Sequence, residues 1–190
     1  MEQKNREPGI KGVVADIIHV QKDYEVAIET ALGGSIQNIV TDNEQTAKRM
    51  IGFLKKNRFG RATFLPLSNI SGRGGLNQRD VLSEPGVVGT ANTLVNADKE
   101  YSELVMYLLG RVLVVDNIDH AIAIGKKYRH SLRMVTIEGE SLSPGGSMTG
   151  GAFKNNSNLL GRRREIEELE RSVGILRKEL EELKKLLNKD

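Results

Sequence analysis

The sequence predicts an α+β (mixed α/β) fold, in which two similar helix–strand–helix–strand subdomains with mixed sheets are followed by a coiled-coil helix. Two observations predict it: a weak internal repeat in the body of the chain, and a heptad pattern of apolar residues over residues 166–190. A chain of 190 residues is long enough to bury a core without covalent cross-links. It contains no cysteine, which excludes disulfides, zinc–cysteine sites and thiol catalysis.

The internal repeat is marked by two similar helices. Tyr24 is followed eight residues later by Leu-Gly, and so is Tyr101. In each copy an apolar, strand-like run comes next and ends in Asp-Asn, whose side chains can cap the following helix. Each of those helices has a basic end, which suits the negative helix terminus, and a short strand follows it. The strands expected on this basis, with one more ahead of the helix at Tyr24, cover residues 13–18, 36–40, 62–65, 112–115 and 134–137.

The C-terminal segment has a strict apolar period. Its apolar residues are spaced alternately by three and four positions, which is the seam of a coiled coil. The alternative is a single amphipathic helix packed on the body. No second strand for a coiled coil is evident, so we expect the chain to be an excised piece whose incoming helix is mostly removed. The seam residues are Ile166, Leu169, Val173, Leu176, Leu180, Leu183 and Leu187.

These features give the expected domain organisation. Residues 1–8 are the stub of an incoming coiled-coil arm, which Pro8 would end. Residues 9–160 are the globular domain, and residues 161–190 begin the returning helix. Within the globular domain, we expect repeat one at about 9–67, a linker at about 68–97 and repeat two at about 98–153.

Charge is distributed unevenly along the chain. The formal net charge is only +3, but acidic residues are absent between Glu44 and Asp80, between Asp119 and Glu138, and between Glu140 and Glu165. Basic residues fill all three gaps. Such segregation can build a positive surface that attracts polyanions, although solvated helix faces with no ligand would show the same pattern.

No motif argues for catalysis. The sequence has no Gly-x-Ser-x-Gly elbow and no phosphate-binding Gly-Lys-Ser/Thr loop. Asp116 with Asp119-His120 could be imagined as a metal cluster, but Asp116 is better explained as a helix cap, and the three histidines lack ligand spacing. We therefore expect no catalytic residue, no metal and no cofactor. No apolar run is long enough for a membrane span, and the charged N-terminus is not a signal peptide, so a cytoplasmic location is expected.

Two glycine pairs form the sharpest local feature. They bracket three residues in the segment Gly145-Gly146-Ser147-Met148-Thr149-Gly150-Gly151. Three interpretations stay open: a plain loop, a phosphate-binding nest, or a strand edge with few side chains to which another chain can pair. Met148 and Thr149 favour extended structure between the pairs.

The combination resembles a known family. A duplicated α/β body, the glycine segment, an Arg-rich junction and a heptad helix together resemble the hinge of SMC (structural maintenance of chromosomes) proteins of prokaryotes. The opening Gly9-Ile10-Lys11-Gly12-Val13, the helix from Tyr24 to Gly34 and the run 141–151 are also similar to this family. The resemblance covers Pro8 to the end.

The resemblance implies a function. SMC hinges dimerise and so join two arms, each an intramolecular antiparallel coiled coil, in a chromosome condensation and segregation complex. ATP hydrolysis belongs to head domains outside this segment, so no enzyme is expected here. The dimer contact implied is Gly145 to Gly151. Weak, sequence-independent DNA binding is implied at Arg162, Arg163 and Arg164, with Lys55, Lys56 and Arg58 as a weaker candidate.

The implied partners are a second copy of the chain, double- or single-stranded DNA, and further condensin subunits elsewhere on the parent protein. A nucleoid-associated location follows. The alternative function is a small-molecule-binding α/β regulatory domain attached to a signalling coiled coil, with a ligand between the two halves.

Overall fold

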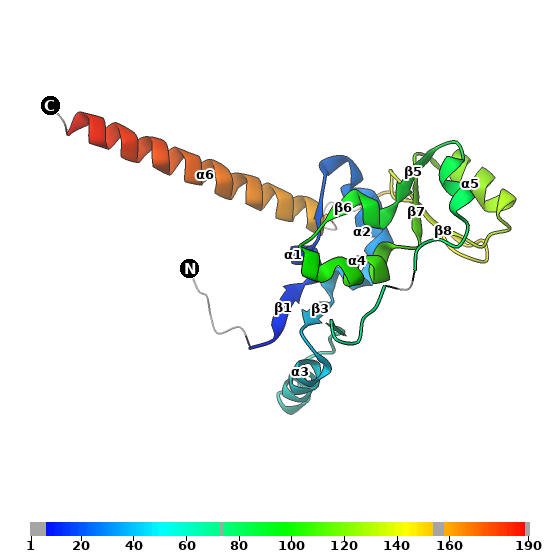
Figure 1. The fold of residues 1–190 in the computed structure, drawn as a ribbon, viewed down its shortest axis with the longest axis horizontal. Helices are drawn as coiled ribbons and strands as arrows, with labels where there is room; N and C mark the ends of the chain where they lie inside the picture. The colour runs from blue at the N-terminus through cyan, green and yellow to red at the C-terminus, as the bar shows by residue number, and fades with distance from the viewer. Residues whose placement is uncertain (1–6, 73, 154–157, 189–190) are drawn as a thin grey trace.

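The computed structural model describes residues 7–72, 74–153 and 158–188. Figure 1 shows two packed subdomains from which one long helix, α6, projects. The expected stub at residues 1–8 lies outside the described residues except for Glu7 and Pro8. The first subdomain comprises β1 (Ile10–Val13), α1 (Val14–Ile17), β2 (His19–Val20), η1 (Lys22–Tyr24), α2 (Glu25–Leu32), η2 (Gly33–Gln37), β3 (Ile39–Thr41), α3 (Glu44–Lys56) and β4 (Phe64–Pro66).

The second subdomain repeats this order and adds a hairpin. It comprises η3 (Arg79–Ser83), β5 (Val87–Thr90), η4 (Ala91–Leu94), β6 (Val95–Asn96), η5 (Lys99–Tyr101), α4 (Ser102–Leu109), β7 (Val112–Val115), α5 (Ile118–Lys127), β8 (Arg133–Thr136), β9 (Ser141–Leu142) and β10 (Met148–Thr149), and α6 (Leu159–Leu187) follows.

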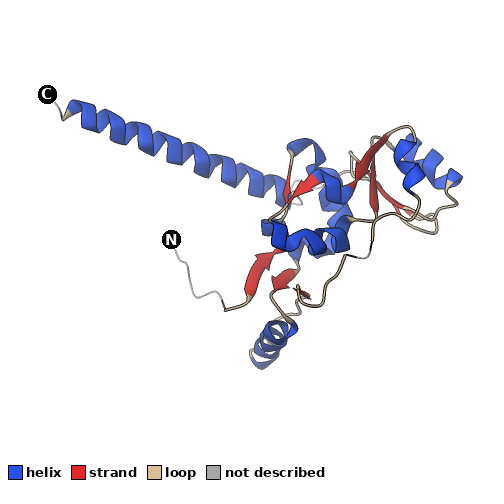
Figure 2. Ribbon diagram, viewed as in Figure 1, coloured by secondary structure: helices blue, strands red, loops and turns tan. Residues whose placement is uncertain are grey.

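The strands form three sheets. The first sheet has the order β1-β3-β4 and the second the order β10-β9-β8-β7-β5, while β2 and β6 pair with each other. In both large sheets a bulged strand, β1 or β5, runs antiparallel to its neighbour, β3 or β7, and β4 or β8 runs parallel to that same neighbour. In Figure 2 helices α2 and α4 lie between the two large sheets. The predicted mixed α+β fold with two repeats is confirmed.

The repeat is longer than its sequence markers suggested. A constant shift of 77 positions relates Gly9 to Gly86, Gly12 to Gly89 and Tyr24 to Tyr101. Both Gly12 and Gly89 have positive φ and lie at the bulges. Residues 68–97, expected to be linker, therefore include the first strands of the second repeat.

Several predicted strands need correction. The strand expected at 13–18 is wrong, because Val14–Ile17 form a helical turn. Val14, Ile17 and Ile18 lie on one buried side of this turn, as residues spaced by three and four positions do in a helix. The periodicity of so short an apolar run does not distinguish a helix from a strand. The run 36–40 is strand only from Ile39, because a 3-10 turn occupies 33–37, and the strand expected at 62–65 begins at Phe64.

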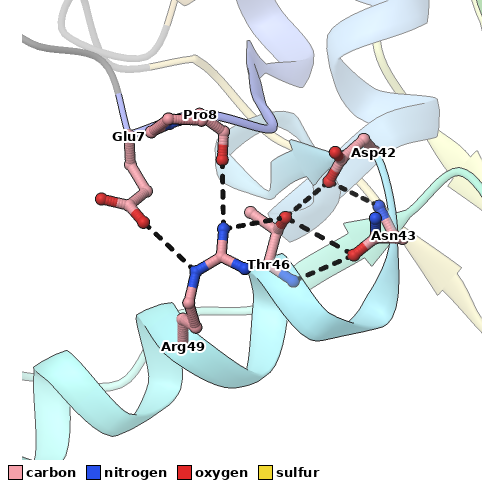
Figure 3. A network of polar contacts seen from close by, with 6 residues as sticks. All are labelled: Glu7, Pro8, Asp42, Asn43, Thr46 and Arg49. Carbon is pink, nitrogen blue, oxygen red and sulfur yellow. Dashed lines mark hydrogen bonds and ion pairs between the residues drawn. The ribbon is translucent and has the colours of Figure 1, made fainter.

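The two Asp-Asn pairs cap helices as predicted. Asn43 accepts a hydrogen bond from the Thr46 backbone N–H, and Asn117 accepts one from the His120 N–H. The preceding aspartates bind the same helices: Thr46 Oγ1 donates to Asp42 at 2.6 Å, and His120 Nδ1 lies 2.7 Å from Asp116. Figure 3 shows the first of these networks, in which Arg49 also reaches Glu7 and the Pro8 carbonyl.

The core is asymmetric between the repeats. One buried cluster lies between the subdomains and takes in Val40, Val114 and Leu160. A second cluster lies between the other face of β7 and α5 and includes Leu113 and Val115, as strand alternation requires. The described residues show no matching cluster under α3, which buries only Thr46 and Ala47. The outer layer of repeat one is therefore less covered than that of repeat two.

Candidate functional site

The glycine segment forms a free sheet edge. Strand β10 pairs with β9 through Met148–Leu142 and Thr149–Ser141, and it ends the sheet order among the described residues. Both of its side chains are exposed, and Met148 is 51% exposed. Because an unpaired edge presents backbone donors and acceptors, β10 can accept another strand.

The glycines shape this hairpin. Gly145, Gly146 and Gly151 have positive φ of 93°, 102° and 133°, which side chains other than glycine adopt at a cost. The Gly145 N–H donates to the His130 carbonyl at 2.8 Å, and Ser143 N–H donates to Ser147 at 2.9 Å. Backbone conformation thus explains these three glycines, whereas the dimer contact expected of them stays a prediction.

A second free edge without a bulge is β4 in repeat one. Strand β4 pairs with β3 alone, and residues 57–63 before it are all exposed. An exposed aromatic pair lies in the chain leading to it, with Phe53 on α3 and Phe59 in the following loop: their rings are 5.9 Å apart, and each is about half exposed. In repeat two the equivalent parallel strand, β8, is covered by the hairpin β9–β10.

An apolar pocket lies next to β10. Its volume is about 180 Å³, and Ile122, Leu132, Met134, Leu142 and Met148 line it together with His130 and Lys126. Met148 thus belongs both to the free edge and to the pocket wall. The pocket is large enough for one bulky side chain.

The predicted DNA-binding arginines lie at the first turns of α6, and two of them are paired. Arg164 forms an ion pair with Glu25, whose side chain is 4% exposed, and a second one with Glu168 at 3.1 Å. These hydrogen bonds raise the pKa of Arg164. Arg163 Nε lies 3.1 Å from Asp16. Arg162 is exposed.

The second predicted basic group lies elsewhere. Lys55 and Lys56 end α3, and Arg58 follows with φ of 54°; all three are exposed. Figure 1 places α3 and the start of α6 in separate regions, so the structure does not join the two basic groups into one patch.

Sequence reasoning missed the acidic partners of α6. Glu29 on α2 accepts a hydrogen bond from the Leu159 N–H at 3.1 Å and so caps α6 from another helix. Burial raises the pKa of Glu29, although this hydrogen bond opposes the shift. The available signal was Glu25 and Glu29, four positions apart on a largely apolar helix.

Other kinds of site are not evident. Within the part of the chain that the structure describes, no group of three or more potential ligand side chains could hold a metal ion. Nor is any helix there sufficiently long and apolar to cross a membrane.

Comparison with known proteins identifies the class. Residues 7–125 match the family model described as "SMC proteins Flexible Hinge Domain". The chromosome partition protein Smc of Bacillus subtilis is 44% identical over 195 residues, which cover 97% of this chain and 16% of that protein. The Smc protein of Methanocaldococcus jannaschii is 40% identical over 152 residues, 80% of this chain and 13% of that protein.

Solved hinge structures share the fold. An asymmetric dimer of the Geobacillus stearothermophilus SMC hinge domain has a TM-score of 0.82 at 40% identity, covering 94% of this chain and 72% of that one. The Pyrococcus furiosus SMC hinge domain has a TM-score of 0.66 at 33% identity, covering 78% and 76%. The chain therefore belongs to the SMC hinge domain family.

This membership confirms the family predicted from sequence. A hinge is a joint between arms, so membership also confirms that this segment is not itself an enzyme. The chain spans about one sixth of the length of the Bacillus subtilis relative. The alternative of a ligand-binding regulatory domain is not favoured by these relatives.

Proposed function

We propose that this chain is the homodimerisation hinge that joins two arms of an SMC chromosome condensation and segregation protein. The observation that carries the proposal is the pair of free, unbulged sheet edges, β4 in repeat one and β10 in repeat two. In the two large sheets the other outer strands, β1 and β5, carry bulges, which discourage edge pairing. The Geobacillus stearothermophilus relative was crystallised as a hinge dimer.

Exchange between two copies would give both free edges, β4 and β10, a partner strand. If β10 of one protomer pairs with β4 of its partner, a two-fold axis repeats the contact, and neither of these edges stays free. The partner's hairpin then covers β4 as β9 covers β8 within one chain. The exposed pair Phe53 and Phe59 ahead of β4 is brought next to the apolar pocket beside Met148.

A charge-swap mixing experiment tests this exchange. Met148→Lys and Phe59→Glu should each give a folded monomer in a sedimentation equilibrium measurement, because each places a charge in both copies of the contact. A mixture of the two variants should dimerise again. In the mixed dimer one contact pairs the lysine with the glutamate and the other is native.

A matched control uses the opposite edge of the same sheet. Val88 on β5 is 37% exposed, and Val88→Lys should stay dimeric. Failure of the mixture to dimerise would reject the exchange between β4 and β10. Dimers of both single variants would reject these edges as the interface.

The arm and the DNA contact complete the proposal. Helix α6 exposes its heptad seam, including Leu169, Leu176 and Leu183, as a returning arm does before it pairs with an incoming helix.

We further propose weak, sequence-independent DNA binding through Arg162, Arg163, Lys55, Lys56 and Arg58, which are exposed cations. In the parent protein, further condensin subunits would bind elsewhere, and the protein would be cytoplasmic and associated with the nucleoid.

A further inference from the structure

A second pocket lies between the connection of the two repeats and the sheet of repeat two. Its volume is about 350 Å³, within the range of about 300–1,000 Å³ that is usual for small-molecule sites. One wall comes from the segment ahead of η3, and the others come from residues next to β7, β8 and β10. The lining residues are Leu76, Asn77, Gln78, Arg111, Ser131, Leu132, Arg133 and Pro144.

Two arginines give the pocket its charge. Arg111 precedes β7 and Arg133 begins β8, and these two strands are neighbours in the sheet. None of the described residues that line the pocket is acidic, so this lining carries two positive charges. Asn77, Gln78 and Ser131 add neutral hydrogen-bonding groups. Because guanidinium groups match the oxygens of phosphates and carboxylates, the lining suits an anion.

Backbone carbonyls orient both guanidinium groups. Arg133 Nη2 donates to the Ala31 carbonyl near the end of α2 at 2.8 Å. Arg111 Nε donates to the Gly74 carbonyl at 3.4 Å. A guanidinium has five N–H donors, so the bond to Ala31 fixes Arg133 and leaves it further donors for a ligand. Side chains that are already held in place lose less freedom when a ligand binds.

The internal repeat provides a control within the molecule. The shift of 77 positions places Gly34 where repeat two has Arg111. Aligned by strand register, Thr63 before β4 takes the place of Arg133 in β8. Repeat one thus forms the same arrangement of central and parallel strands with an uncharged residue at both positions. The two positive charges are therefore not required to form such a sheet.

We propose that this pocket binds a small organic phosphate, that is, a free molecule with a phosphate monoester on a compact apolar body. Two guanidinium groups match the two charges of a phosphate monoester, whereas a carboxylate offers only one. Leu76, Leu132 and Pro144 supply apolar surface for the rest of the molecule. A DNA duplex is instead contacted by rows of cations along its backbone, and the described lining presents two cations at one point. The site goes beyond the proposed hinge function and is built by one protomer.

Isothermal titration calorimetry with phenyl phosphate tests the site, because this probe joins a phosphate monoester to a flat apolar ring. We expect one binding site per chain. Inorganic phosphate and phenol are the two halves of the probe, and each lacks one of the two kinds of contact. Each should therefore bind at least about tenfold more weakly than phenyl phosphate.

Two variants and a matched control assign the charge. Arg111→Gln and Arg133→Gln should each weaken the binding of phenyl phosphate by about tenfold or more, because each removes a charge-assisted contact. Arg79→Gln removes the same charge at an exposed position outside the lining and should bind as the native sequence does. Denaturant unfolding shows whether each variant is folded. Arg111→Gln keeps the test decisive if Arg133→Gln, which loses its native bond to Ala31, does not fold.

Nuclear magnetic resonance of backbone amides locates the probe. Amides of Gln78, Ser131 and Leu132 should shift with phenyl phosphate, while those of Lys55 and Arg162 should not. No binding at millimolar probe, full binding by both arginine variants, or shifts confined to α3 and α6 would overturn the site.

The remaining outcomes concern the class of ligand. Equal affinity for inorganic phosphate would overturn an organic ligand. The same amide shifts with a 5′-phosphorylated DNA duplex would overturn a free small molecule. None of these results alters the dimer, which the sedimentation measurement tests separately.

Discussion

Glu25 and Arg164 are 139 positions apart in the sequence, and their side chains form an ion pair where α6 leaves the domain. This pair joins the second helix of repeat one to the arm. It also occupies Arg164, one of the three arginines that were expected to bind DNA. Position in the fold, rather than charge alone, therefore decides which cation is available to a polyanion.

The two members of this pair should respond unequally to substitution. Arg164→Leu leaves Glu25 buried without a partner and should reduce the free energy of unfolding more than Glu25→Gln does. Glu25→Gln leaves Arg164 partly in water and still paired with Glu168, so a loss of about 1–2 kcal/mol is expected. Denaturant titration of both variants measures the difference. Equal losses would mean that Glu25 is not held by Arg164.

Equivalent glycines should be equally sensitive. Gly9 and Gly86 have φ of 95° and 86°, and an added Cβ would collide with Asp42 in one repeat and with Asp116 in the other. Alanine at either position should therefore destabilise the domain by about 1–3 kcal/mol. Gly34→Ala is the control, because a Cβ there meets no atom within 4 Å. Thermal unfolding of the three variants is the measurement.

Acid should weaken both helix caps. The hydrogen bond from Thr46 lowers the pKa of Asp42, and that with His120 lowers the pKa of Asp116, from the usual value of 3.8. A lowered folded-state pKa contributes stability above pH 3.8 that is lost as pH falls through the lower value. Asp42→Asn with Asp116→Asn should thus flatten the acid side of the stability profile. A profile as steep as that of the native sequence would argue against this role.

Loss of the exposed arginines should weaken DNA binding. Arg162→Gln with Arg163→Gln should lower the slope of log affinity against log salt by about 2, since each phosphate contact contributes roughly one unit. Arg164 is left intact because its removal unpairs Glu25. Lys99→Gln, on an exposed turn of repeat two, is the matched control. An unchanged slope would move the contact to Lys55, Lys56 and Arg58.

The arm helix should gain order from a partner. Most of α6 has no neighbour on the described body, and in proteins most helical stability comes from packing of an amphipathic face. Adding a heptad segment that matches the seam ahead of residue 1 should raise the helical circular dichroism signal and the unfolding temperature. The same segment with its apolar positions changed to serine is the control. Equal signals from both would contradict the antiparallel arm.

Local sequence signals determined the elements whose physics is local. The Asp-Asn caps, the amphipathic helices after them and the heptad helix depend on hydrogen bonds and apolar spacing within a few residues, so they were predicted correctly. The repeat of Tyr24 and Tyr101 was recognised for the same reason. Its full extent, from Gly9 and Gly86, is marked only by a constant shift between a few matched residues, which is too sparse a signal to define the repeat.

Tertiary structure alone decided which surfaces are available. The run at 13–18 is apolar apart from Asp16 and is compatible with a strand or a helix; in the structure Val14–Ile17 are helical, and Val14 and Ile17 are buried in the core. The sequence placed Arg162, Arg163 and Arg164 together, but it could not show that Arg164 points to Glu25 and Arg163 to Asp16. Contacts between residues far apart in the chain depend on how the two repeats and α6 pack, and that packing is not encoded in any short stretch of sequence. Tertiary structure also decides that β4 and β10 are free edges, because a strand is an edge only when no other strand pairs with its outer side.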